Sequence, residues 1–121
     1  MMDVREYETE DMPLTRSFKD TVKARAERDA AFREALLGEG VDALLAGDMD
    51  TGKAILRDYI NATVGFEKLA EETGTPTKSL MRMFGPRGNP NARNLFSVLH
   101  RLQRSSGVSL RVRPSRPARA T

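Results

Sequence analysis

The segment from Leu69 to Gly85 joins two short helical patterns across a sharp break, and it constrains the fold more than any other part of the chain. Ala70 is small enough to let two helices cross closely, and Gly74 adopts the positive φ of a tight turn at little cost. Pro76 suits the first turn of the second helix, where its missing N–H needs no partner. The pattern predicts a helix-turn-helix whose core residues are Leu69, Ala70, Gly74, Leu80 and Met83.

Apolar residues at helical spacing predict further helices on both sides of this motif. One helix is expected from Thr15 to about Leu37, ended by Gly38 and Gly40, with a short helix at Val41–Ala46 after it. A longer helix is expected at Thr51–Thr63, with Asp50 as its N-cap and Gly65 closing it. The motif itself comprises Phe66–Thr73 and Thr77–Phe84, and a last helix runs from about Asn91 to Ser105 before Gly107. We therefore expect an all-α fold, a compact bundle of about five to six helices.

The C-terminal segment has a strand period, because Val108, Leu110 and Val112 alternate with polar residues. A lone strand leaves its backbone hydrogen-bonding groups unmatched. The same strand of a second copy is the favoured partner, and this pairing would give a two-fold homodimer. Two alternatives remain: pairing with Val4–Thr9, or lying across the core of its own chain.

At 121 residues the chain fits one domain. Its expected parts are a flexible N-terminal arm (1–14), a helical acidic region (15–48), the helix-turn-helix domain (49–107), a dimerisation strand (108–113) and a disordered basic tail (114–121). The N-terminal sequence contains no apolar run typical of a signal peptide, and no stretch approaches the length of a membrane span. A cytoplasmic location without a membrane partner is expected.

Charge is divided unevenly along the chain. Residues 1–50 hold thirteen acidic and seven basic side chains (−6), whereas residues 51–121 hold four acidic and thirteen basic (+9). From Thr73 to Thr121 there is no Asp or Glu. Such a division indicates a nucleic-acid-binding face at one end, although a merely solvated dipolar surface would produce the same totals. The acidic half is either a helical cap that supports the dimer or a docking surface for a basic protein.

The sequence lacks the combinations of residues that are typical of catalytic or metal-binding sites. There is no cysteine, and the only histidine, His100, has no second ligand at metal-binding spacing. Neither an acid/base pair nor a glycine-rich phosphate loop is evident. We therefore expect neither an enzyme nor a protein that carries a metal or another cofactor.

The outward face of the second motif helix carries the residues suited to contact DNA. With Leu80 facing the core, a turn of 100° per residue places Lys78 and Arg82 near the opposite pole. Arg82 could pair with guanine, and Met81 could touch a thymine methyl group. The predicted base contacts are Thr77, Lys78, Ser79, Met81 and Arg82. The competing interpretation is a generic helical hairpin with a solvated face.

The residues Leu69-Ala70, Gly74, Leu80, Gly85, Asn89-Pro90 and Leu95 resemble the phage-repressor-like (Xre/Cro) helix-turn-helix superfamily. The Gly88–Pro90 turn, the leucine-rich helix after it and the Leu110–Pro114 strand resemble the addiction-module antidote (HigA-type antitoxin) group of that superfamily. The resemblance implies an all-helical domain that dimerises on double-stranded DNA and represses its own promoter. In antitoxin members it also implies a cognate ribonuclease-type toxin that the protein neutralises.

Carried over by position, the resemblance implies DNA phosphate contacts at Arg87, Asn89, Asn91 and Arg93. The expected function is that of a sequence-specific transcriptional regulator, a repressor that binds a palindromic operator as a homodimer and controls its own operon. The alternative is an antitoxin whose main role is to bind and neutralise its toxin.

Overall fold

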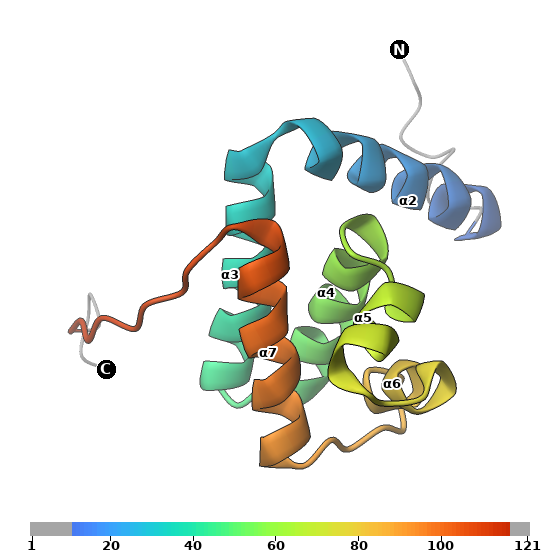
Figure 1. Ribbon diagram of the computed structural model, residues 1–121. Helices are drawn as coiled ribbons and strands as arrows, with labels where there is room; N and C mark the ends of the chain where they lie inside the picture. Colours follow the sequence, from blue (N-terminus) through green and yellow to red (C-terminus); the bar gives the residue numbers. More distant parts are fainter. Residues whose placement is uncertain (1–10, 117–121) are drawn as a thin grey trace.

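Within the described residues, the fold consists of helices, the turns between them and an extended segment after the last helix. The computed structural model describes residues 11–116, which form α2 (Asp11–Arg28), α3 (Ala30–Leu45), α4 (Met49–Ala62), α5 (Phe66–Thr73), α6 (Thr77–Met83) and α7 (Ala92–Ser106). Within these residues there is no strand, so the expectation of an all-α fold is confirmed. In Figure 1, α2 lies across one end of the molecule and α6 lies near the other, with α4 between them.

α3 and α4 pack at close range because glycines lie where the two helices meet. A Cβ atom at Gly40 would lie 3.0 Å from Leu56 Cδ2, and one at Gly52 would lie 2.5 Å from Leu44 Cδ2. The expectation that Gly38 and Gly40 end a helix, with a separate helix at 41–46, is therefore wrong, since α3 continues through both glycines. Gly40 is buried and provides room for α4, a gain that outweighs the low helix propensity of glycine.

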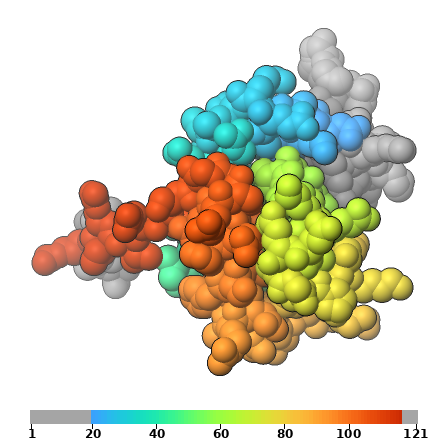
Figure 2. Space-filling view, in the orientation of Figure 1, coloured from blue at the N-terminus to red at the C-terminus, as the bar shows by residue number. Residues whose placement is uncertain are grey.

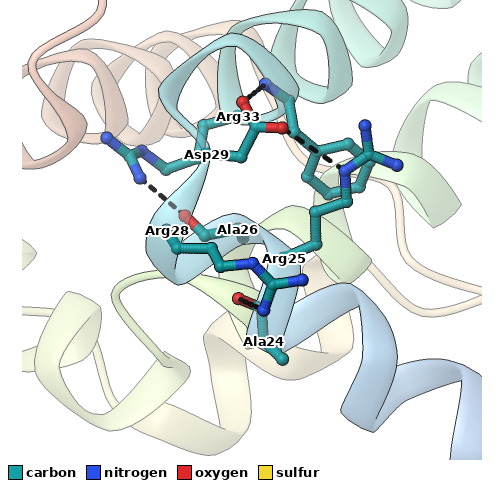
Figure 3. Close-up of polar contacts among 7 residues, drawn as sticks. Ala24, Arg25, Ala26, Arg28, Asp29 and Arg33 are labelled. Atoms are coloured by element: carbon teal, nitrogen blue, oxygen red, sulfur yellow. Dashed lines mark hydrogen bonds and ion pairs between the residues drawn. The ribbon is translucent and has the colours of Figure 1, made fainter.

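The break between the first two helices lies at Asp29 instead. The Asp29 carboxylate accepts a hydrogen bond from Phe32 N at 3.1 Å, which caps α3, and it also pairs with the Arg25 side chain at 3.4 Å. Arg33 Nη1 donates to Ala26 O at 2.6 Å across the bend (Figure 3). The Arg25 guanidinium lies 4.7 Å from the ring centre of Phe32. Together these contacts fix the angle between α2 and α3.

The next two helices also begin at defined caps. Asp48, not Asp50, is the N-cap of α4, because its Oδ1 accepts from Thr51 N at 3.2 Å and the helix starts at Met49. Gly65, at a φ of 85°, donates its N–H to Ile60 O and accepts a hydrogen bond from Leu69 N. α4 ends at Ala62 with Thr63 as its C-cap, so Gly65 follows the helix end and is the N-cap of α5 rather than the C-cap of α4.

The core is a single cluster built mainly from α4, α5 and α7. Tyr59 is fully buried at its centre, and its phenol bonds to Ser106 Oγ on α7. Burial raises the pKa of Tyr59 above its ordinary value, an effect larger than the opposing one of the Ser106 hydrogen bond. The other fully or almost fully buried large side chains are Leu37, Leu56, Ile60, Leu69, Leu80, Phe84, Val98 and Leu102.

The segment after α7 is extended but forms no strand within the described residues. Val108 N donates to Gln103 O at 3.2 Å, and Leu110 N donates to Gln103 Oε1 at 2.9 Å. Val108 and Leu110 pack against the core, whereas Val112 is 76% exposed. The end of the described chain projects from the body, in red in Figure 2. Pairing of this segment across a dimer stays a prediction.

Both expected terminal segments, the N-terminal arm and the basic tail, lie partly outside the described residues. α2 begins at Asp11, within the expected arm, while residues 1–10, including the possible pairing strand Val4–Thr9, lie outside the described residues. Residues 117–121 of the expected basic tail also lie outside them. Among residues 11–116, no helix is both long enough and apolar enough to cross a membrane.

Candidate nucleic-acid interface

α5 and α6, the two helices of the predicted helix-turn-helix, are joined by a tight turn at Gly74. Gly74 has a φ of 72°, in the left-handed region, and its N–H donates to Ala70 O at 2.9 Å. Thr75 N donates to the same carbonyl at 3.2 Å, so the chain reverses within one residue of the helix end. Leu69 and Leu80 are fully buried, Ala70 is 8% exposed, and Met83 packs against the core at its edge. Pro76 is the N-cap of α6.

The side of α6 opposite Leu80 faces solvent. Lys78 and Arg82 are exposed there, and Met81 is 52% exposed although it is a large apolar residue. Thr77 and Ser79 are half-buried at the margins of this face. An exposed helix with cations at its pole and an apolar side chain beside them has the donors and the methyl contact that base edges require.

A pocket of about 310 Å³ brings α6 together with the turn that follows it. It is lined by Ser79, Arg82, Met83, Arg87, Gly88 and Asn89. The structure thus places two predicted base-contact residues, Ser79 and Arg82, beside two predicted phosphate-contact residues, Arg87 and Asn89. Both arginines are exposed and available to an anion.

The other two predicted phosphate residues lie at the start of α7, outside this pocket. Asn91 is the N-cap of α7, and its Oδ1 accepts a hydrogen bond from Asn94 N at 2.8 Å. Only its amide N–H groups therefore stay available for an anion. Arg93 is exposed in the first turn of α7, where the helix dipole also favours negative charge.

Two cations of α4 hold the turn after α6, a role that the sequence interpretation missed. Lys53 Nζ donates to Gly85 O at 3.0 Å and to Gly88 O at 2.6 Å, while Arg57 Nη1 donates to Phe84 O at 2.6 Å. Lys53 is only 3% exposed. A signal for its burial was present, because Lys53 precedes Leu56 and Ile60 at helical spacing on the core-facing stripe of α4.

The turn itself lies directly against the C-terminal end of α6. A Cβ atom at Gly88 would lie 2.5 Å from Met83 O and would also overlap Arg82 O. Gly85 N donates to Arg82 O at 3.1 Å, and Gly88 N donates to Gly85 O at 3.0 Å. The backbone of residues 85–88 therefore packs on the helix with no room for a side chain at position 88.

The interface is electropositive because its cations have no acidic neighbours in sequence. Lys78, Arg82, Arg87 and Arg93 are exposed, and the described chain contains no carboxylate side chain between Thr73 and Arg116. Within residues 11–116, no group of three or more His, Asp or Glu side chains is placed to hold a metal ion.

Comparisons of the chain with known protein families, with curated proteins and with solved structures find no match. The likeness to phage-repressor and antidote proteins therefore rests on the residues of the motif alone. The function has to be inferred from the geometry of α5, α6 and the turn after them.

Proposed function

We propose that this protein is a sequence-specific, double-stranded-DNA-binding transcriptional regulator that acts in the cytoplasm as a repressor of its own operon. The observation that carries the proposal is the outer face of α6, where exposed Lys78, Met81 and Arg82 lie next to a pocket that also contains Arg87 and Asn89. A helix of this kind fits the major groove, while the arginine of the following turn reaches the phosphate backbone.

Each side chain has a role that follows from its chemistry. Arg82 donates two hydrogen bonds to guanine O6 and N7, and Met81 contacts a thymine methyl group. Lys78 reaches a guanine or a phosphate, and Thr77 and Ser79 contact the margin of the groove. Arg87, Asn89, Arg93 and the amide group of Asn91 bind phosphate and fix the orientation of α6.

A homodimer carries two copies of this interface, related by two-fold symmetry, and therefore recognises a palindromic operator. The extended segment after α7 offers the means of association, because Val112 projects into solvent while Val108 and Leu110 are anchored to the core. Antiparallel pairing of residues 108–113 with the same residues of a second copy satisfies backbone groups and buries Val112. Two α6 helices then read half-sites about one helical turn of DNA apart.

The salt dependence of DNA binding tests this proposal. If each subunit makes about four phosphate contacts, the logarithm of the binding constant falls with the logarithm of salt concentration at a slope of roughly −7 for the dimer. The probe is the DNA directly upstream of the protein's own gene, and the control is a random duplex of equal length. A gel shift with no salt-resistant preference for the upstream DNA contradicts the proposal.

A second candidate function is an antidote that masks a ribonuclease-type toxin. It is favoured by the exposed carboxylates of α3, which are Glu34, Glu39 and Asp42. These side chains provide a surface complementary to a basic protein, separate from the cations of α6. Co-purification with the product of an adjoining gene supports this role, and it is compatible with DNA binding. Absence of such a complex, with operator binding intact, leaves regulation as the only function.

A further inference from the structure

The position of α6 depends on contacts at its ends, because the helix has only seven residues. A helix this short is not stable alone in water. Its last carbonyl groups have no partners within the helix and need donors from elsewhere. The turn after α6 has the same need, since it leaves the helix without entering another regular element until α7.

Donors for the C-cap residue of α6 and for the turn after it come from Lys53 and Arg57, one turn apart on α4. The Arg57 side chain donates a hydrogen bond to the carbonyl oxygen of Phe84, the C-cap residue of α6. The Lys53 ammonium group donates to the carbonyl oxygens of Gly85 and Gly88, at the two ends of the turn. Hydrogen bonds from charged donors are shorter and stronger than neutral ones. Positive charge is also favourable at the C-terminal end of a helix. We call Lys53 and Arg57 the α4 clamp.

The turn held by the clamp is the one that carries Arg87. Gly85 and Gly88 flank this arginine, and both of their carbonyl oxygens are bound by the single ammonium group of Lys53. Gly88 at the same time lies against the carbonyls of Arg82 and Met83. The clamp thus fixes the turn relative to α6, and with it the position of Arg87 and Asn89 relative to Arg82 in their shared pocket.

We infer that Lys53 and Arg57 are positioning residues of the DNA interface: they contact no DNA but align the phosphate-binding turn with the base-reading helix. This inference rests on the proposed function. It adds two residues of α4 to an interface that otherwise consists of α6, the turn and the start of α7. Since binding requires base and phosphate contacts to form together, a loosened turn lowers the affinity for the specific site.

The test compares Lys53→Met and Arg57→Met with Lys68→Met as a matched control, since Lys68 is an exposed residue of α5 that lines a separate pocket with residues of α2 and α7. Binding to the DNA upstream of the protein's own gene and to a random duplex is measured by fluorescence anisotropy at several salt concentrations. Lys53→Met is expected to weaken binding to the upstream DNA by about tenfold or more. The magnitude of its salt slope should fall by about 2 for a dimer, as one phosphate contact per subunit is lost. Lys68→Met should change neither quantity.

Two further variants guard against a general loss of structure. Arg57→Met removes a single hydrogen bond and keeps Lys53. If Lys53→Met fails to fold, the DNA-binding measurement is made with Arg57→Met instead. Arg57→Lys restores a charged donor and should recover part of the affinity that Arg57→Met loses. Amide hydrogen exchange should be faster in α6 and residues 84–88 of the clamp variants, with α3 unchanged.

The outcomes separate the two proposals. If the wild-type protein prefers its upstream DNA and the clamp variants keep its affinity and salt slope, the positioning inference is overturned while the proposed function stands. If the wild-type protein shows no preference for that DNA, the proposed function fails and the inference fails with it. Reduced affinity with an unchanged salt slope also overturns the inference, since the phosphate contacts would then be intact.

Discussion

At the scale of single residues, two glycines are chemically identical but have opposite roles. A methyl group at Gly88 meets the carbonyls of Arg82 and Met83, whereas one at Gly38 meets nothing within 4 Å. Gly88→Ala should therefore destabilise the fold by about 1–3 kcal/mol, as overpacking against backbone does. Gly38→Ala should stabilise it by about 0.5–1 kcal/mol, because alanine is the better helix former.

Urea unfolding followed by circular dichroism measures both effects. The two variants carry the same added methyl group, so each is the control for the other. Equal stability of the two variants would show that the turn does not lie on the end of α6.

Asp29 gives the bend between α2 and α3 a dependence on pH. The backbone N–H of Phe32, more than the Arg25 side chain, lowers the pKa of Asp29 below its ordinary value. A carboxylate with a lowered pKa contributes stability at pH values above its ordinary range, and that stability is lost as the pH falls through the lowered value. Wild-type protein should therefore lose stability in acid, measured as a falling urea midpoint.

The matching variant is Asp29→Ala, which removes both the cap and the titrating group. It should be less stable than wild type at neutral pH, and the gap should close in acid. A gap of constant size across this pH range contradicts the role given to Asp29.

At the same scale, the sequence predicts the role of a residue when that role depends only on the geometry of a single helix. The exposure of Lys78 and Arg82 opposite Leu80 follows from the helical period alone. The role of Lys53 does not, because its partners Gly85 and Gly88 are 32 and 35 residues away in the chain. Only the folded structure brings the ammonium group of Lys53 to those carbonyls.

At the scale of elements, α6 has one side chain that is fully buried in the core. Leu80 is fully buried, whereas Met81 is half exposed on the same short helix. Leu80→Ala should cost about 2–5 kcal/mol of unfolding free energy, the range for truncated buried leucines. Met81→Ala should change it by less than about 0.5 kcal/mol, as surface substitutions do. Denaturant unfolding of both variants tests this contrast, and a similar cost at both positions would contradict the burial of Leu80.

The elements that the sequence predicts best are those with local signals at both ends. α5, α6 and α7 match their expected ranges within about one residue, because Gly65, Gly74, Asn91 and Gly107 mark where each begins or ends. The first two helices were divided at the wrong place. Asp29 is a capping residue inside a continuous helical pattern, and Gly38 and Gly40 are tolerated within α3 because α4 packs against it. Only tertiary contacts distinguish a glycine that ends a helix from one that makes room for a neighbour.

At the scale of the whole molecule, the proposed dimer associates through the segment after α7. Val112 is 76% exposed, and pairing of residues 108–113 would bury it. Val112→Asp introduces like charges near the two-fold axis and should weaken the dimer by about tenfold or more. Sedimentation velocity over a range of concentrations measures the change, with Ser97→Asp as the control, at an exposed position of α7 outside residues 108–113. A Val112→Asp protein with unaltered association would place the dimer contact elsewhere.

The most direct test of the central claim, that the outer face of α6 reads DNA sequence, is the affinity of Arg82→Ala for the DNA upstream of the protein's own gene. The matched control is Arg104→Ala, an exposed arginine in the last turn of α7. Arg82→Ala should lose about 1–3 kcal/mol of binding free energy and relax the preference at one base pair in each half-site, while Arg104→Ala keeps both. An Arg82→Ala protein that binds this DNA with wild-type affinity and wild-type base preference would contradict the account.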